Sequence, residues 1–164
     1  MARNFIKRFK TLAMNVETKE LKISSPSFNN EGEIPSKYTC DGEGINPALR
    51  IENIPEDTKT LALIVEDPDA PNGVFDHWVV WNINPVTRIE EQSNPGTSGN
   101  NSAGKSGYHP PCPPAGSHRY YFYVFALDAT LDLLAGTNKQ ELKSAMEGHV
   151  MAKGSLMGHY KRKK

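Results

Sequence analysis

The sequence TLALIVEDPDAP, at positions 60–71, decides the fold. Its first half is almost wholly apolar, and this pattern predicts a central β-strand over Thr60–Glu66 that is buried on both faces. Pro68 and Pro71 follow closely, and proline cannot donate a hydrogen bond to a strand ladder. We therefore expect the chain to leave the sheet at Asp67.

A second apolar run continues the sheet. The sequence HWVVWNI predicts a buried strand over His77–Ile83. Simple alternation places every second side chain on one face, namely His77, Val79, Trp81 and Ile83. The opposite face then holds Trp78, Val80 and Asn82.

A third strand is predicted over Arg119–Leu127, from the sequence RYYFYVFAL, and we expect it to begin at His118 or one residue later. One of its faces holds His118, Tyr120, Phe122 and Val124. The other holds Arg119, Tyr121, Tyr123 and Phe125.

The rest of the chain predicts shorter elements. With 13 Gly and 12 Pro residues among short β-rich runs, the composition is typical of an all-β domain with elaborate loops. We expect a first strand over Leu21–Phe28, a turn-rich stretch over Thr39–Asn46, an extended segment over Pro47–Ile54 and a final strand over Ser155–Tyr160.

One helix is predicted near residues 138–152. Thr137 and Gln140 have the spacing of a capping box, with Thr137 as the N-cap. We expect the helix to end before Gly154. Its apolar stripe is formed by Leu142, Ala145, Met146, His149 and Val150.

Length and charge narrow the class of protein. The 164 residues suit one domain, which we place at residues 19–164, after an N-terminal extension over residues 1–18. Lys plus Arg and Asp plus Glu are balanced at 19 each, which argues against a nucleic-acid binder. No apolar stretch is long enough to span a membrane, and we recognise no export signal.

We therefore expect a cytoplasmic protein in which Cys40 and Cys112 are reduced thiols. In the extension, Phe5, Ile6, Phe9, Leu12 and Ala13 have the spacing of a short amphipathic helix. The simplest interpretation of that segment is a frayed or self-packed end.

Polar side chains gather where the predicted strands meet loops. Asp67 and Asp69 follow one strand, His77 opens the next, and His118 and Tyr120 open the third. Imidazole and phenol groups can donate hydrogen bonds to an anion, and the carboxylates can orient the histidines. The sequence thus indicates an anion pocket, although Asp67 and Asp69 could instead only cap turns.

Two other kinds of chemistry are weaker alternatives. Asp67, Asp69, His77 and His118 are suitable metal ligands, but no compact metal motif is present, so we expect no metal. Cys112 could act as a nucleophile with His77 or His118, but prolines flank it and nothing nearby lowers its pKa. We expect no catalytic residues, no cofactor and no enzyme activity.

The long loop from Asn84 to Ser117 ends in a proline-rich segment, Tyr108–Gly116, which proline makes stiff. Long loops without structure of their own are often functional. We therefore expect this segment to contribute to the site.

These motifs resemble the phosphatidylethanolamine-binding proteins, and the prokaryotic, Raf-kinase-inhibitor-like branch in particular. The resemblance covers roughly residues 21–160. It depends on the sequences DPDAP at 67–71, HWV at 77–79 and PPCPPAGSHRY at 110–120, in this order. The sequence YTCDG at 38–42 also fits.

The resemblance implies an antiparallel β-sandwich with a few short helices and a small pocket for phosphate-like anions or phospholipid headgroups. It also implies possible inhibition of a kinase or serine protease, and a homodimer is possible. Carried over one by one, the pocket positions are Asp67, Asp69, Pro71, His77, Pro111, His118 and Tyr120.

One departure from the family concerns the pocket wall. The family often has glycine just before the proline that aligns with Pro111, whereas this chain has His109 and Pro110 there. Proline offers no N–H to an anion and occupies space that glycine leaves open. We expect a narrower pocket with His109 near its mouth.

Overall fold

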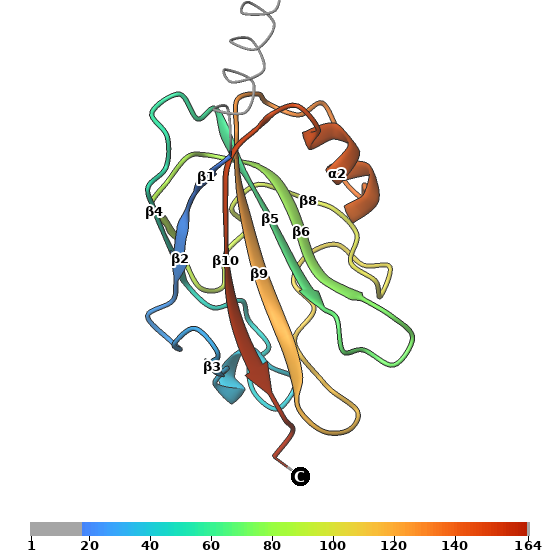
Figure 1. The fold of residues 1–164 in the computed structure, drawn as a ribbon. Helices are drawn as coiled ribbons and strands as arrows, with labels where there is room; N and C mark the ends of the chain where they lie inside the picture. The colour runs from blue at the N-terminus through green and yellow to red at the C-terminus, as the bar shows by residue number, and fades with distance from the viewer. Residues whose placement is uncertain (1–17, 164) are drawn as a thin grey trace, which may run out of the picture.

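The computed structural model describes residues 18–163, so the N-terminal extension and its amphipathic pattern lie outside the described residues. Figure 1 shows the long strands running side by side, with the α-helix over the upper part of the sheet. The elements, in order, are β1 (Lys19–Glu20), β2 (Lys22–Ser24), β3 (Gly32–Glu33), the 3-10 helix η1 (Ser36–Tyr38), β4 (Leu49–Glu52), β5 (Thr60–Asp67), β6 (Phe75–Ile83), β7 (Arg88–Ile89), β8 (Thr97–Ser98), β9 (His118–Leu127), α2 (Lys139–Met146) and β10 (Val150–Tyr160).

The three strands predicted from apolar runs form the centre of the larger sheet. This sheet has seven strands in the order β1-β10-β9-β5-β6-β8, with β3 also paired to β10. Its central strand, β5, is buried along nearly its whole length, as expected. The third predicted strand begins at His118, also as expected.

The smaller sheet has three strands in the order β2-β4-β7. Its apolar side chains, such as Ile51 and Ile89, share one core with Leu63 and Phe122 of the larger sheet. A second core lies on the opposite face of the larger sheet, where Leu142 and Met146 of α2 cover it. The large sheet therefore has an apolar core on each side.

The fold is mainly β with few helices, which confirms the predicted class. The finer description as an antiparallel sandwich is not confirmed, because the sheets do not close and β10 pairs in parallel with both β1 and β3. No helix within residues 18–163 is long and apolar enough to cross a membrane.

A β-bulge corrects the predicted face of Ile83. Leu61 pairs with Ile83 and Leu63 pairs with Val80, so β6 has one more residue than β5 between these pairs. Asn82 takes a left-handed conformation there, with φ of 53°. The extra residue breaks simple alternation, and Ile83 joins Val80 in the core between the sheets.

The helix is shorter than predicted and has a different cap. Asn138, not Thr137, is the N-cap, and its side-chain oxygen accepts a hydrogen bond of 2.9 Å from the backbone N–H of Glu141. The helix ends at Met146, and Gly148 follows with φ of 80°. Val150, expected on the helical stripe, instead begins β10.

The first and last strands also differ from expectation. The segment predicted as one strand from Leu21 to Phe28 forms a strand only at β2, and β1 precedes it in the other sheet. The last strand begins at Val150, five residues before its predicted start at Ser155, and it pairs with β9 along ten positions from Val150 to Tyr160. Because β10 also pairs with β1 and β3, it has three neighbours in the larger sheet.

Candidate functional site

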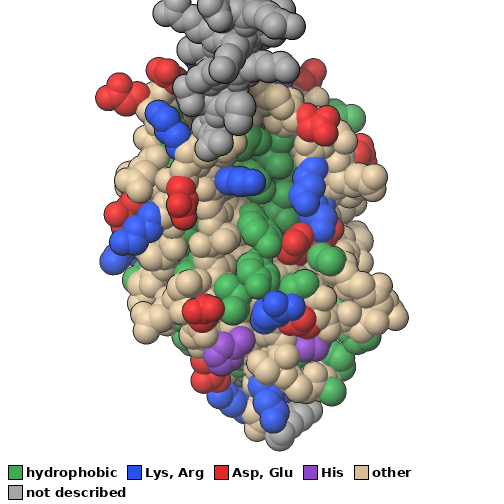
Figure 2. All heavy atoms as spheres, in the orientation of Figure 1, with side chains coloured by type: hydrophobic (Ala, Val, Ile, Leu, Met, Phe, Trp, Pro, Cys, Tyr) green, Lys and Arg blue, Asp and Glu red, His purple; other side chains and the backbone are tan. Residues whose placement is uncertain are grey.

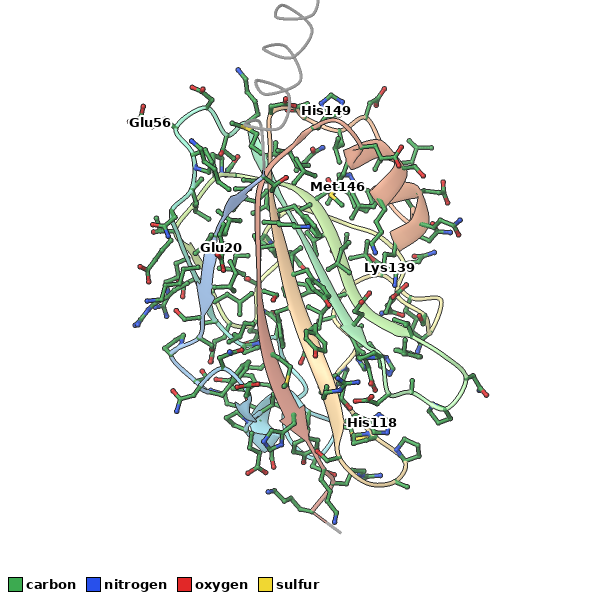
Figure 3. The ribbon with its side chains drawn as sticks, viewed as in Figure 1. Glu20, Glu56, His118, Lys139, Met146 and His149 are labelled. Atoms are coloured by element: carbon green, nitrogen blue, oxygen red, sulfur yellow. A yellow bond between two sulfur atoms is a disulfide. The ribbon has the colours of Figure 1, made fainter. Side chains whose placement is uncertain are left out.

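Three strand ends meet at one end of the larger sheet, where β5 ends and β6 and β9 begin. Asp67 at the end of β5 pairs with Phe75 at the start of β6, and Glu66 pairs with Tyr121 near the start of β9. Figure 3 shows His118 at this lower end and Met146 of α2 toward the other. The pairing therefore gathers the predicted polar side chains, because antiparallel neighbours start and end together.

A second bulge turns His77 toward the site. Val65 pairs with Trp78 and Glu66 pairs with Asp76, so His77 is left as the extra residue on β6. Bulges commonly re-aim a side chain in this way.

The prediction that His77 shares a face with Val79 and Trp81 is therefore wrong. Those two residues pack in the core beneath α2. The ring of His77 instead lies with its centroid 5.2 Å from that of Tyr120, whose side chain belongs to the core between the sheets.

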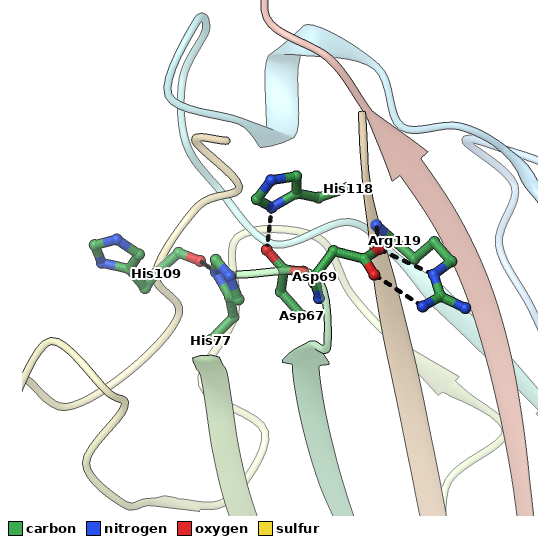
Figure 4. A network of polar contacts seen from close by, with 6 residues as sticks. All are labelled: Asp67, Asp69, His77, His109, His118 and Arg119. Atoms are coloured by element: carbon green, nitrogen blue, oxygen red, sulfur yellow. Dashed lines mark hydrogen bonds and ion pairs between the residues drawn. The ribbon is translucent and has the colours of Figure 1, made fainter. Parts of the chain in front are cut away.

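Asp67 and His118 form a buried pair. Nδ1 of His118 lies 2.7 Å from Oδ2 of Asp67, and the two residues are 7% and 3% exposed. The other carboxylate oxygen of Asp67 accepts the backbone N–H of Asp69 at 2.7 Å, which closes the turn after β5. Asp67 thus both caps a turn and orients an imidazole (Figure 4). The two interpretations of this residue, as a turn cap and as an orienting group, are therefore both correct.

Asp69 binds Arg119, a residue that sequence reasoning missed. Its carboxylate accepts Nε and Nη2 of Arg119 at 2.9 and 2.8 Å, and also the Arg119 backbone N–H at 2.9 Å. The Arg119 hydrogen bonds lower the pKa of Asp69 from 3.8 to about 2. The sequence contains one signal for this contact. Arg119 stands at the start of a predicted strand, and Asp69 lies in the acidic loop after another predicted strand.

His77 is fixed by the backbone of His109. Nδ1 of His77 donates to the carbonyl oxygen of His109 at 2.7 Å, and the His109 N–H donates to the His77 carbonyl at 2.8 Å. Burial lowers the pKa of His77 from 6.5 to about 4. The ring of His109 packs 5.3 Å from Phe75 and 5.6 Å from His77, measured between centroids.

Tyr120 lies next to both histidines and leaves its hydroxyl unpaired. The residue is fully buried, and no residue in 18–163 forms a hydrogen bond to its hydroxyl. Burial, with the nearby charges of Asp67 and Asp69, raises the pKa of the phenol. A buried polar group without a partner costs about 1–3 kcal/mol, so a ligand that pairs with it would gain that energy.

The two predicted prolines lie in different settings. Pro111 is buried, and its carbonyl accepts the backbone N–H of Cys40 at 3.1 Å. Pro71 is exposed in the loop after β5. Pro71 takes no part in the hydrogen bonds, within residues 18–163, of the other predicted site residues.

A disulfide links Cys40 to Cys112, and this corrects the expectation of reduced thiols. The two residues are 72 positions apart, but the proline-rich segment packs on the turn after η1 and brings their Cα atoms to 5.4 Å. Sequence spacing could not show this contact. The bond also removes Cys112 as a candidate nucleophile, because the thiol is no longer free.

No metal centre is evident in residues 18–163, since no three His, Cys, Asp or Glu side chains are arranged to hold an ion. Asp69, a candidate ligand, is occupied by Arg119. A hollow of about 1240 Å³ lies elsewhere, between α2 and the β1–β2 segment, and includes none of His77, His118 and Tyr120. Figure 2 shows the apolar surface on this face of the molecule.

Comparisons with known proteins identify the family. Residues 24–161 match the family model described as phosphatidylethanolamine-binding protein. A UPF0098 protein of Pyrococcus horikoshii is 49% identical over 90% of this chain and 79% of its own length. Another from Methanothermobacter thermautotrophicus is 45% identical over 87% of this chain and 99% of its own length.

Two solved structures have the same fold. One is a putative phosphatidylethanolamine-binding protein homolog from Chlamydia trachomatis, with 42% identity, coverage of 88% of this chain and 99% of the other, and a TM-score of 0.85. The other is E. coli YbcL, with 25% identity, the same coverage and a TM-score of 0.80. This chain belongs to the phosphatidylethanolamine-binding protein family, as a member of its prokaryotic branch.

Proposed function

We propose that this protein is a non-catalytic binding protein whose pocket takes phosphate-like groups or phospholipid headgroups. The pocket lies at the end of the larger sheet where β5, β6 and β9 meet. Its proposed ligand-binding residues are Asp67, Asp69, Pro71, His77, Pro111, His118 and Tyr120.

The unpaired hydroxyl of Tyr120 is the observation that carries this proposal. It is a buried donor beside two imidazole rings, at a strand end where loops leave the sheet. Preformed sites usually combine an apolar lining with a few such convergent polar groups. An anionic oxygen accepting from Tyr120 would supply the missing partner.

The acidic residues orient the site in this proposal. Asp67 holds His118 through Nδ1, and Asp69 holds Arg119 through its fork of N–H groups. Carboxylates engaged in this way are poor candidates for direct contact with an anion. Asp67 fixes the His118 ring and Asp69 fixes Arg119, as partners behind binding residues commonly do.

Tyr120→Phe tests the pocket directly, with NMR titration of phosphoethanolamine as the measurement. We expect about a tenfold loss of affinity, because one hydrogen bond to a charged group is removed. Tyr123→Phe is the matched control, since Tyr123 belongs to the same strand and faces the other side of the sheet, where it packs on the core beneath α2. His118→Ala should weaken binding as well. If Tyr120→Phe and His118→Ala both leave the titration unchanged, the pocket assignment is wrong.

The alternative is a protein interaction module that inhibits a kinase or serine protease. The observation in its favour is a half-buried aromatic surface on the outer face of β9. There, Tyr121 and Tyr123 stack with centroids 5.6 Å apart, beside the hollow near α2. Inhibition of purified serine proteases or kinases by the wild type, lost in the double variant Tyr121→Ser and Tyr123→Ser, would support this alternative.

We also propose that the protein acts in the cytoplasm under either function.

A further inference from the structure

Part of the outer face of the larger sheet lies open beside α2, in the hollow of about 1240 Å³. Its floor includes Ile64 of β5 and the rings of Tyr123 and Phe125 of β9. Both rings are only half-buried within residues 18–163. Figure 2 shows the apolar surface that results in the middle of this face. Covering these rings would remove apolar surface from water, so the hollow favours an apolar occupant.

The size of the hollow favours a chain segment over a small molecule. Small-molecule sites usually have volumes of about 300–1,000 Å³, and this hollow is larger. It runs along β10 from Val150 to Leu156, which at the rise of a strand is a length of about 20 Å. A segment that carries several apolar side chains in a row fits this shape.

The charges at the rim do not select a strongly charged occupant. The rim carries both signs, from Lys19, Lys22, Lys143, Lys153, Glu20, Glu66 and Glu147. Of these, Glu66 is already paired with Lys139. A surface of mixed sign gives a strongly basic or strongly acidic partner little net attraction. The apolar floor therefore decides what binds.

The chain itself supplies a segment at the edge of this hollow. Thr18 and Lys19, the first described residues, are part of its lining. Because β1 pairs in parallel with β10, with Lys19 opposite Ala152, residues 1–17 join the described chain near the start of β10. A segment joined by a short connection has an effective concentration of about millimolar, so a weak contact suffices to hold it.

The sequence of this segment has an apolar side. Apolar residues recur at helical spacing, namely Phe5, Ile6, Phe9, Leu12 and Ala13. A helix of this length is marginal by itself in water, so its apolar side needs a surface to cover. As a helix, residues 5–13 would span about 12 Å, which is shorter than the hollow. Residues 14–17 remain for the turn that leads to Thr18.

We propose that residues 1–17 bind in the hollow of the same chain and complete the outer layer that α2 begins. Phe5 and Phe9 lie against Tyr123 and Phe125. The inference is independent of the proposed anion pocket, because none of the residues assigned to that pocket lines the hollow.

The basic residues of the segment determine its orientation in this arrangement. Helical spacing puts Arg3, Lys7 and Lys10 on the side opposite Phe5 and Phe9. With the apolar side on the floor, these three cations face water and stay away from the lysines of the rim. Charge repulsion between exposed groups is further reduced by salt.

A nitroxide spin label on the full chain tests the proposal by NMR. Thr11→Cys places the label on the polar side of the segment, and the native disulfide leaves no other free thiol within residues 18–163. The amide signals of Tyr123 and Phe125 should lose most of their intensity. The signal of Ile89, in the smaller sheet behind the larger one, should keep its intensity. Unchanged signals of Tyr123 and Phe125 would overturn the proposal.

Two double variants of the labelled chain separate the apolar side from the basic side. Phe5→Ser with Phe9→Ser should restore the signals of Tyr123 and Phe125, because the contact with the floor is lost. Arg3→Ser with Lys7→Ser is the matched control and should leave the signal loss unchanged. Signal loss that persists in the first variant, or that disappears in the second, would contradict the proposed orientation.

A mixed sample shows which chain supplies the segment. Isotope-labelled chains without the nitroxide are mixed with nitroxide chains that carry no isotope, and Tyr123 should then keep its full signal. Signal loss in this mixture would assign the hollow to a second copy of the chain and overturn the proposal. Sodium chloride at about 0.5 M should not weaken the contact within one chain, since salt screens charges and leaves apolar contacts in place. Release by salt would show that ion pairs hold the segment, against the proposal.

Discussion

Two polar clusters use adjacent residues of β5 but differ in how completely they are paired. Glu66 points toward α2, where Nζ of Lys139 lies 2.8 Å from its carboxylate and 2.6 Å from that of Asp76. Asp67 points to the opposite face and pairs with His118. Alternation along a strand therefore sends two consecutive carboxylates to two different environments.

The cluster under α2 satisfies its own charges, whereas the cluster at the site does not. Lys139 bridges two carboxylates that are both largely buried, so it binds the helix to two strands. At the site, Asp67 and His118 pair with each other, but Tyr120 next to them has an unpaired hydroxyl. The first arrangement is typical of a structural contact, and the second is typical of a place for a ligand.

The largest expected effect concerns the covalent link at the site end. Replacing Cys40 and Cys112 by serine together should lower the free energy of unfolding by about 4 kcal/mol, because a crosslink over this separation restricts the unfolded chain strongly. Urea unfolding of the variant and the oxidised wild type measures the difference. Adding a phosphine reductant should lower wild-type stability by a similar amount and leave the variant unchanged. Equal stability of all these forms would show that the site end does not depend on the disulfide.

The next effect concerns the buried neutral histidine. The pKa of His77 is about 4 in the folded protein against 6.5 for an ordinary histidine, so between these values only the unfolded chain takes up the proton. The stability contribution is therefore complete above pH 6.5 and is lost as the pH falls toward 4, by about 3 kcal/mol in all. Urea unfolding at several pH values should show this slope in the wild type and a smaller one in His77→Gln. The slope should persist in His149→Gln, and its persistence in His77→Gln as well would assign the proton to another group.

The smallest effect concerns the closed cluster under α2. Lys139→Met keeps the apolar length of the side chain but leaves Glu66 and Asp76 without their shared cation. We expect a loss of about 2 kcal/mol in urea unfolding, which is below the value for fully buried pairs because water reaches these groups in part. Lys143→Met, on an exposed part of the same helix, is the matched control.

The same variant separates the two clusters functionally. Lys139→Met should leave the affinity for methyl phosphate within about twofold of the wild type, since Lys139 pairs with Glu66 and Asp76 and not with a proposed ligand-binding residue. A large loss of ligand affinity would show that the cluster under α2 positions the site. That result would mean that the two clusters form one connected network, and that they cannot be divided into a structural cluster and a binding cluster.

The sequence by itself determined the central sheet and the approximate place of the site. Three apolar runs gave β5, β6 and β9 with boundaries within two residues, because a strand buried on both faces can tolerate few polar residues. The prolines after Asp67 marked the end of β5 for the same local reason. The predicted pairing of Asp with His at this end was also found, between Asp67 and His118.

Only the tertiary structure decided the details that give the site its chemistry. The bulge that turns His77 toward Tyr120 arises from the register between β5 and β6, which simple alternation along one strand does not contain. The partner of Asp69 is Arg119, fifty residues away, and the partner of Cys40 is Cys112. Each of these contacts depends on how distant segments pack, whereas the strands depend on their own residues. A sequence pattern records local preferences directly, but long-range contacts appear only when the whole chain has folded.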